Sequence, residues 1–156
     1  MRKFLSILGA LTLIVILASG IGFGVFLYKG NALDAESKAF VDSAVPAIAA
    51  TWSKQQFLDR AAPELRERVK PEELNALFDH FAQLGPLVRY EGATGEAMMS
   101  YMAGAGSTVS ASYVAKARCQ NGGVTFRIGL LKRDGRWMVR DFRVDSVPGS
   151  QTGRGA

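Results

Sequence analysis

The side chains best suited to acid–base or nucleophilic catalysis are scarce in this sequence, whose 156 residues contain one histidine, His80, and one cysteine, Cys119. A catalytic imidazole needs a carboxylate that orients one ring nitrogen and a reacting group near the other. Asp79 precedes His80 in the sequence, and successive side chains on a helix point about 100° apart. We therefore expect His80 to be a surface or boundary residue, and we predict that the protein has no catalytic residue and is not an enzyme.

Metal and cofactor chemistry finds equally little support. One cysteine and one histidine cannot supply the ligand clusters of zinc or iron–sulfur sites, or a disulfide within the chain. Cys119 falls on the apolar side of a predicted strand, where a thiol behaves as a small hydrophobe. Met98, Met99 and Met102 form a soft cluster that is more typical of a core or an interface than of a metal site. We predict no cofactor and no metal.

Basic side chains suggest a different chemistry, the binding of acidic groups. Residues 30–96 carry seven basic and eleven acidic side chains, whereas residues 97–156 carry nine and three. Strand alternation predicts that four basic side chains share one sheet face: Lys116, Arg118, Arg127 and Arg133. Arg140 and Arg143 lie nearby, depending on a bulge in the last strand. This face is either simply solvated or binds an acidic partner or anionic lipid headgroups. The chain lacks basic runs interleaved with aromatic residues, so we expect no nucleic-acid binding.

An uncharged, apolar stretch begins the chain. Residues 4–28 contain no charged side chain, and as a helix rising 1.5 Å per residue they can cross a hydrocarbon core of about 30 Å. A cleaved signal peptide is the alternative, because Ala18–Gly20 offers small residues after a basic start. The apolar stretch continues well beyond Gly20, which favours an uncleaved single-pass anchor over residues 1–29.

The charges that flank this stretch predict its orientation. Arg2 and Lys3 precede it, whereas Lys29 follows it alone and is soon followed by acidic residues. The positive-inside rule places the N-terminus in the cytoplasm and the remaining chain in the periplasm, at a bacterial inner membrane. Gly20 and Gly24 form a G-x-x-x-G pair that would let two spans pack closely, although glycine is also common in transmembrane helices in general.

Helical periodicity follows the anchor. Apolar residues recur at three- and four-residue spacing, which predicts a helix that Pro46 kinks: Phe40, Val41, Ala44, Val45, Ile48 and Trp52. Ser53 with Gln56 resembles a capping box for a short helix, and another short helix follows Pro63. A longer helix begins at Pro71, in the position that proline prefers, and ends at Gly85-Pro86.

From Leu87 onward the apolar period changes from 3.6 to 2, which predicts four strands. The first covers about residues 90–102, and the second, residues 108–119, alternates strictly. We expect the Asn121-Gly122 and Asp134-Gly135 pairs to form the next two turns. The last strand changes phase between Val139 and Phe142, which predicts a bulge near Arg140-Asp141.

These elements predict an α+β fold in which an N-terminal transmembrane helix precedes helices packed on a four-stranded antiparallel meander sheet. The domain covers residues 30–147, and residues 148–156 form a flexible tail. Five aromatic residues lie between helices and sheet, where they either line a small-ligand pocket or fill a plain core: Trp52, Phe78, Phe81, Tyr113 and Phe126.

The last strand reads G-x-W-x-V-x-x-F-x-V over Gly135–Val144, and Leu84-Gly85 precedes Tyr90-x-Gly-x-x-Gly. With these motifs, residues 33–147 resemble the nuclear transport factor 2-like and cystatin-like α+β group, and within it small bacterial membrane-anchored domains. Enzymes of that group carry acid–base side chains inside the cone of the sheet. The inward positions of this sequence are all apolar, so the resemblance implies the fold but no catalytic residue.

These observations predict a non-enzymatic, membrane-anchored periplasmic domain that acts as a protein-interaction or accessory module of the cell envelope. Its partner would be a second copy of the chain or another envelope protein. A small-ligand-binding domain is the alternative.

Overall fold

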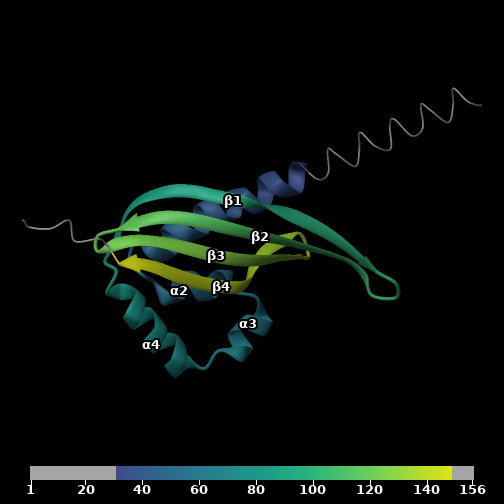
Figure 1. The fold of residues 1–156 in the computed structure, drawn as a ribbon. Coiled ribbons are helices and arrows are strands. Elements are labelled where there is room, and N and C mark those ends of the chain that lie inside the picture. The colour runs from purple at the N-terminus through teal and green to yellow at the C-terminus, as the bar shows by residue number, and fades with distance from the viewer. Residues whose placement is uncertain (1–30, 149–156) are drawn as a thin grey trace, which may run out of the picture. The chain divides into compact units, whose positions relative to one another are not determined.

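Four antiparallel strands form one sheet in the computed structural model, which describes residues 31–148 (Figure 1). They follow one another as a meander: β1 Leu87–Met102, β2 Gly106–Cys119, β3 Gly122–Arg133 and β4 Arg136–Pro148. A helix over residues 31–49 comes before them, followed by α2 Lys54–Arg60, α3 Pro63–Arg68 and α4 Pro71–Ala82. The predicted combination of helices with an antiparallel meander is confirmed.

Some predictions concern other parts of the chain. The predicted membrane span at residues 4–28, with Gly20 and Gly24, lies outside the described residues, and so does the tail after Pro148. Within residues 31–148, no helix has both the length and the apolar character that crossing a membrane requires.

The helices begin where the sequence indicates. The Ser53 hydroxyl oxygen accepts a hydrogen bond from the backbone N–H of Gln56 at 3.2 Å and caps α2. Helices α3 and α4 begin at Pro63 and Pro71, where the missing N–H would have had no partner within the helix. The first helix continues through Pro46 to residue 49, so this proline does not end it.

The strand register confirms the predicted alternation and the bulge. Alternate residues of β2 are buried: Ala111, Tyr113, Ala115, Ala117 and Cys119. Between β3 and β4, Gly129 lies opposite Asp141 and Leu130 lies opposite Val139, which leaves Arg140 as the extra residue. The inward phase is thereby restored for Phe142, which packs on the core.

One of the two predicted turns is correct and the other is wrong. Asp134 and Gly135 adopt φ values of 52° and 75°, as a tight turn with two positive φ angles requires. The β2–β3 loop instead consists of Gln120 and Asn121, and neither has a positive φ. The end of α4 determines this loop, because the Asn121 N–H donates to the Leu84 carbonyl at 2.9 Å.

The core lies between the helices and one face of the sheet. Its largest fully buried side chains come from the first helix and from β3 and β4: Val41, Val45, Ile48, Phe126, Leu130 and Val139. An edge contact adds to this packing, because the Ala62 N–H donates to the Val139 carbonyl at 2.8 Å. The opposite face of the sheet does not take part in this core.

Candidate interaction surface on the open sheet face

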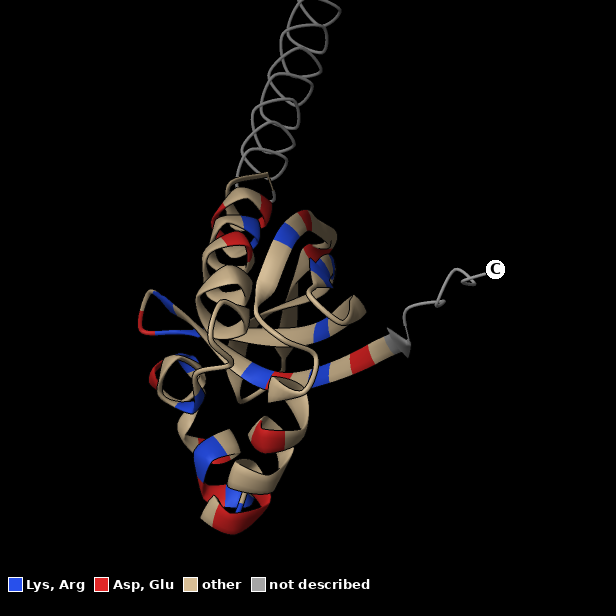
Figure 2. Ribbon diagram, turned by 90° about the vertical axis from the view of Figure 1, so that its left-hand side faces the viewer, with Lys and Arg blue, Asp and Glu red and all other residues tan. Residues whose placement is uncertain are grey.

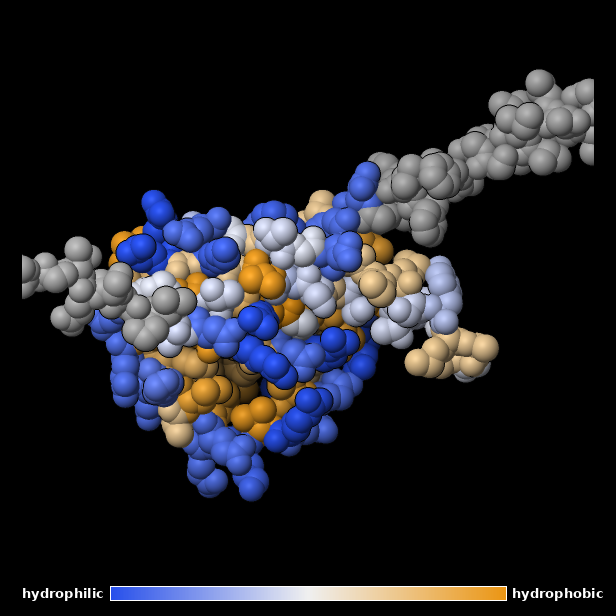
Figure 3. Space-filling view, in the orientation of Figure 1, coloured by the Kyte–Doolittle hydropathy of each residue, from blue (hydrophilic) through white to orange (hydrophobic). Residues whose placement is uncertain are grey.

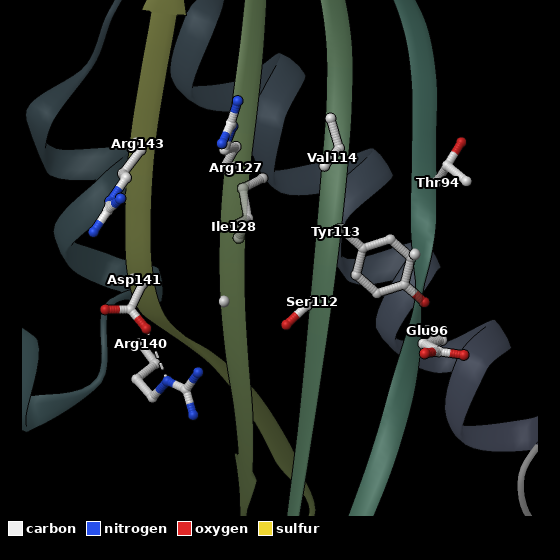
Figure 4. A pocket seen from close by; sticks show the side chains of 12 residues that line it. Thr94, Glu96, Ser112, Tyr113, Val114, Arg127, Ile128, Arg140, Asp141 and Arg143 are labelled. Atoms are coloured by element: carbon white, nitrogen blue, oxygen red, sulfur yellow. Dashed lines mark hydrogen bonds and ion pairs between the residues drawn. The ribbon is translucent and has the colours of Figure 1, made fainter.

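The side chains that point away from the helices come from all four strands and border a shallow depression of about 780 Å³ (Figure 4). We call this surface the open face and define it by eleven residues: Thr94, Glu96, Ser112, Val114, Lys116, Arg118, Arg127, Gly129, Arg140, Asp141 and Arg143. Lys116 and Arg118 belong to it because they share the outward phase of Ser112 and Val114 on β2.

Strand register aligns these residues in rows across the sheet. Thr94, Val114, Arg127 and Arg143 are paired neighbours in one row, and Glu96, Ser112, Gly129 and Asp141 are paired neighbours in the next. Figure 4 shows the Arg127 and Arg143 side chains on neighbouring strands, with Asp141 and Arg140 just beyond Arg143. The basic groups therefore gather on β3 and β4.

The β4 bulge explains why a third arginine belongs to this group. In a regular strand, successive side chains point to opposite faces, so Arg140 and Asp141 could not both face outward. The extra residue at Arg140 removes that restriction, and both side chains border the depression. Gly129 provides the room, because a Cβ atom there would lie 3.0 Å from Asp141 Oδ2 and 3.4 Å from Arg140 Nη2.

Two carboxylates moderate the positive charge without removing it. Arg127 Nε lies 3.1 Å from Asp145 Oδ2, and Arg140 Nε lies 2.9 Å from Asp141 Oδ2. No carboxylate of the described residues lies within 4.0 Å of the Arg143 guanidinium. Exposed ion pairs of this kind contribute at most about 1 kcal/mol, so an incoming acidic group can replace them at little cost.

Three of the four predicted basic residues lie on this face. Lys116, Arg118 and Arg127 do, together with Arg140 and Arg143. Arg133 lies at the end of β3, and its Nη1 is 2.7 Å from Glu64 Oε1 of α3. A backbone hydrogen bond, and then this contact with Arg133, lower the pKa of Glu64. Figure 2 shows charges of both signs on the helices and mainly lysine and arginine on the strands.

The aromatic residues predicted to line a pocket or fill the core pack against one another in the core. Trp52, Phe78, Phe81, Tyr113 and Phe126 are all buried. The Trp52 ring centroid lies 5.4 Å from that of Phe81 and 6.0 Å from that of Phe126, and Trp52 Nε1 donates to the Gly85 carbonyl at 2.7 Å. These three rings therefore pack directly against one another in the core.

A hollow bordered by hydrophobic surface lies between β4 and the helices α3 and α4 (Figure 3). Two half-buried residues pack against the core, Leu58 of α2 and Phe142 of β4. The Phe142 ring centroid lies 5.2 Å from that of Phe57. The hollow is a candidate position for an apolar ligand.

The two candidate catalytic side chains differ in their exposure to solvent. His80 is exposed on α4, and Cys119 is buried at the end of β2, where burial raises the pKa of its thiol and disfavours the reactive thiolate. Among residues 31–148, no three histidine, cysteine or acidic side chains are grouped closely enough to hold a metal ion.

Comparisons of the chain with models of protein families, with curated proteins and with solved structures find no match. The resemblance to the nuclear transport factor 2-like and cystatin-like group therefore stays a prediction, and the open face is interpreted from its own chemistry.

Proposed function

We propose that this protein is a non-enzymatic, single-pass membrane-anchored domain on the periplasmic side of a bacterial inner membrane, and that its open face binds an acidic segment of another envelope protein. One observation carries the proposal. Arg127, Arg140 and Arg143 gather on a sheet face that no described helix covers, and the two that form ion pairs do so only through exposed contacts.

The chemistry of the open face favours a protein partner. A guanidinium group presents a planar fork of donors that matches a carboxylate, and arginine is enriched at protein interfaces. Val114 lies in the same row as Arg127 and exposes 42 % of its surface. Arginine beside an exposed apolar side chain is a combination that protein interfaces use.

The membrane anchor supports the same proposal. Residues 4–28 are uncharged, and the flanking charges predict a cytoplasmic N-terminus. An anchor keeps the domain close to other envelope proteins, which compensates for a shallow, weakly binding surface by raising the local concentration of its partner.

Co-purification from mildly solubilised membranes tests the proposal. The full-length protein is compared with the Arg127→Gln/Arg143→Gln variant and with the matched Arg66→Gln/Arg68→Gln variant, which removes two exposed arginines from α3. We expect a co-purifying protein that the first variant loses and the second keeps, and whose yield falls at high salt. The same yield from all three proteins would contradict the proposal.

The hollow between β4 and the helices favours a second candidate function, the binding of a small apolar ligand (Figure 3). Calorimetric titration of the full-length protein with a long-chain fatty acid tests it. Saturable binding that Phe142→Ala weakens and Arg143→Gln leaves unchanged would favour this function over the first.

A further inference from the structure

The hairpin between β1 and β2 extends beyond the rest of the sheet. β2 pairs with β3 only from Val109 onward, whereas three further pairs join β1 and β2 alone: Ser100 with Thr108, Tyr101 with Ser107, and Met102 with Gly106. Figure 1 shows this two-stranded projection reaching past the β3–β4 turn. We call residues 98–108 the hairpin arm, which consists of this projection and of Met98 and Met99 at its base.

The hairpin arm is apolar, uncharged and exposed. Tyr101, Met102 and Met98 expose 76 %, 72 % and 58 % of their surface, and Met99 is exposed as well. No charged residue occurs between Glu96 and Lys116. In Figure 3 the projection has tan and pale colours, without the dark blue of charged side chains.

Both sides of the hairpin arm share this character. Strand alternation places Met98 and Met102 on one side and Met99 and Tyr101 on the other. A flat protein surface that docked against the hairpin arm would cover one side and leave the other in water. A lipid interface surrounds an inserted hairpin and accommodates both sides.

The chain enters the domain beside the base of the hairpin arm. Asp34 is the first residue of the compact unit that contains the sheet, and its Oδ1 accepts a hydrogen bond from the Ala97 N–H at 2.6 Å. Glu36 forms an ion pair with Lys132 near the end of β3. These contacts fix the beginning of the first helix at the end of the sheet from which the hairpin arm projects.

Chain length then limits how far the bilayer can lie from this point. Six steps along the chain lead from Tyr28, the end of the uncharged stretch, to Asp34. They span about 9 Å as a helix and at most about 20 Å when extended. The five steps along the strand from Ala97 to Met102 reach about 17 Å. The tip of the hairpin arm is therefore long enough to meet the membrane surface.

We propose that the hairpin arm inserts into the interfacial region of the same bilayer that residues 4–28 cross. The inference rests on the proposed membrane anchor and is independent of the partner bound at the open face. Tyrosine is favoured at the level of the lipid headgroups, and unbranched methionine side chains adapt to disordered lipid. The outer backbone edges of the hairpin need hydrogen-bond partners, which limits insertion to the interface, where water and headgroups are present.

Site-specific fluorescence on the full-length protein in vesicles tests this inference. An environment-sensitive dye is attached at Met102→Cys, at Met98→Cys or, as the control, at Arg136→Cys, in a Cys119→Ala background. Arg136 is exposed beside the β3–β4 turn, at the same end of the sheet. The vesicles contain phosphatidylcholine and phosphatidylglycerol, with or without a nitroxide-labelled lipid that quenches the dye.

We expect the dye at Met102 to be quenched about twofold more strongly than the dye at Arg136, and the dye at Met98 to be intermediate, because insertion depth decreases from tip to base.

Vesicle flotation of the same samples tests the anchor separately. A protein that floats but shows equal quenching at positions 102 and 136 would overturn the inference and leave the anchor intact. A dye at position 102 that is shielded from water but not quenched by lipid would show that protein covers the hairpin arm, which also overturns the inference. A protein that does not float would contradict the anchor itself, and the inference with it.

Discussion

Arg127 and Arg143 lie directly opposite each other on β3 and β4, in a sheet where like charges at paired positions destabilise the fold. Only Arg127 has a carboxylate within ion-pair distance among the described residues, at Asp145. Two arginines in this relationship contribute nothing favourable to each other in the isolated domain. An acidic partner placed between them would relieve their repulsion, which is why we assign them to binding rather than to stability.

The first prediction compares a core residue with one of these arginines. Phe126 is fully buried between Trp52 and Phe142, so Phe126→Ala should lower the free energy of unfolding by about 3 to 5 kcal/mol. Arg143→Gln should change it by less than about 0.5 kcal/mol, or raise it slightly, because it removes repulsion at the surface. Denaturant unfolding of both variants measures the difference. Equal losses would show that the inward and outward faces have been assigned incorrectly.

Two glycines of the sheet, Gly95 on β1 and Gly123 on β3, should respond differently to alanine. A Cβ atom at Gly95 would lie 2.0 Å from the Ser112 carbonyl oxygen and 2.8 Å from Tyr113 Cα, both of them backbone atoms that cannot move aside easily. Gly95→Ala should therefore cost at least about 1 to 3 kcal/mol. At Gly123 no atom lies within 4 Å of the added Cβ, so Gly123→Ala should be tolerated. A stable Gly95→Ala variant, in thermal melts of the two proteins, would contradict the described β1–β2 pairing.

The half-buried hydroxyl of Tyr90 predicts a dependence of stability on alkaline pH. Burial, and then the hydrogen bond from Tyr90 Oη to Asp42 Oδ1 at 2.7 Å, raise the pKa of Tyr90 in the folded state. The resulting stabilisation is fully present below the ordinary tyrosine pKa of about 10 and is lost as the pH rises toward the higher folded value. The stability advantage of the wild type over Tyr90→Phe should therefore shrink once the pH rises above the ordinary tyrosine pKa of about 10.

Urea unfolding at a series of pH values measures this advantage. The Tyr101→Phe variant is the control, because it removes an exposed hydroxyl from the hairpin arm. If the difference between wild type and Tyr90→Phe stays constant across the alkaline range, Tyr90 does not keep its proton through contact with Asp42.

Helix pairing within the membrane gives a further prediction. If Gly20 and Gly24 let two spans approach closely, replacing either with isoleucine should separate them, because lipid offers no hydrophobic driving force for association. Gly20→Ile and Gly24→Ile should then reduce chemical cross-linking of the full-length protein in membranes. Gly9→Ile changes a glycine outside the pair and is the control. Unchanged cross-linking in both variants would place any self-association in the domain.

Much of the fold follows from local sequence patterns. Proline at Pro63 and Pro71 marks two helix starts, and the change of apolar phase between Val139 and Phe142 reveals the bulge that turns Arg140 outward. These signals are local, because each depends on a residue and its nearest neighbours in the chain. The arginines of the open face on β3 and β4 could therefore be identified once the bulge was taken into account.

Other features depend on contacts between distant parts of the chain. The position of the β2–β3 loop depends on the Leu84 carbonyl, and Arg133 is removed from the open face by Glu64, which lies far away in the sequence. Alternation alone could not reveal either contact. The hairpin arm was equally hidden, since only the register with β3 shows that β1 and β2 continue beyond their neighbour.

Photo-crosslinking in intact cells tests the central claim most directly, with a photoreactive phenylalanine analogue in place of Val114 in the middle of the open face. We expect irradiation to join the full-length protein to one envelope protein, and we expect this adduct to disappear in the Arg127→Gln/Arg143→Gln variant and to persist in the Arg66→Gln/Arg68→Gln variant. The absence of any adduct, or an adduct that is equally abundant in both variants, would contradict the claim that the arginines of the open face bind an acidic partner.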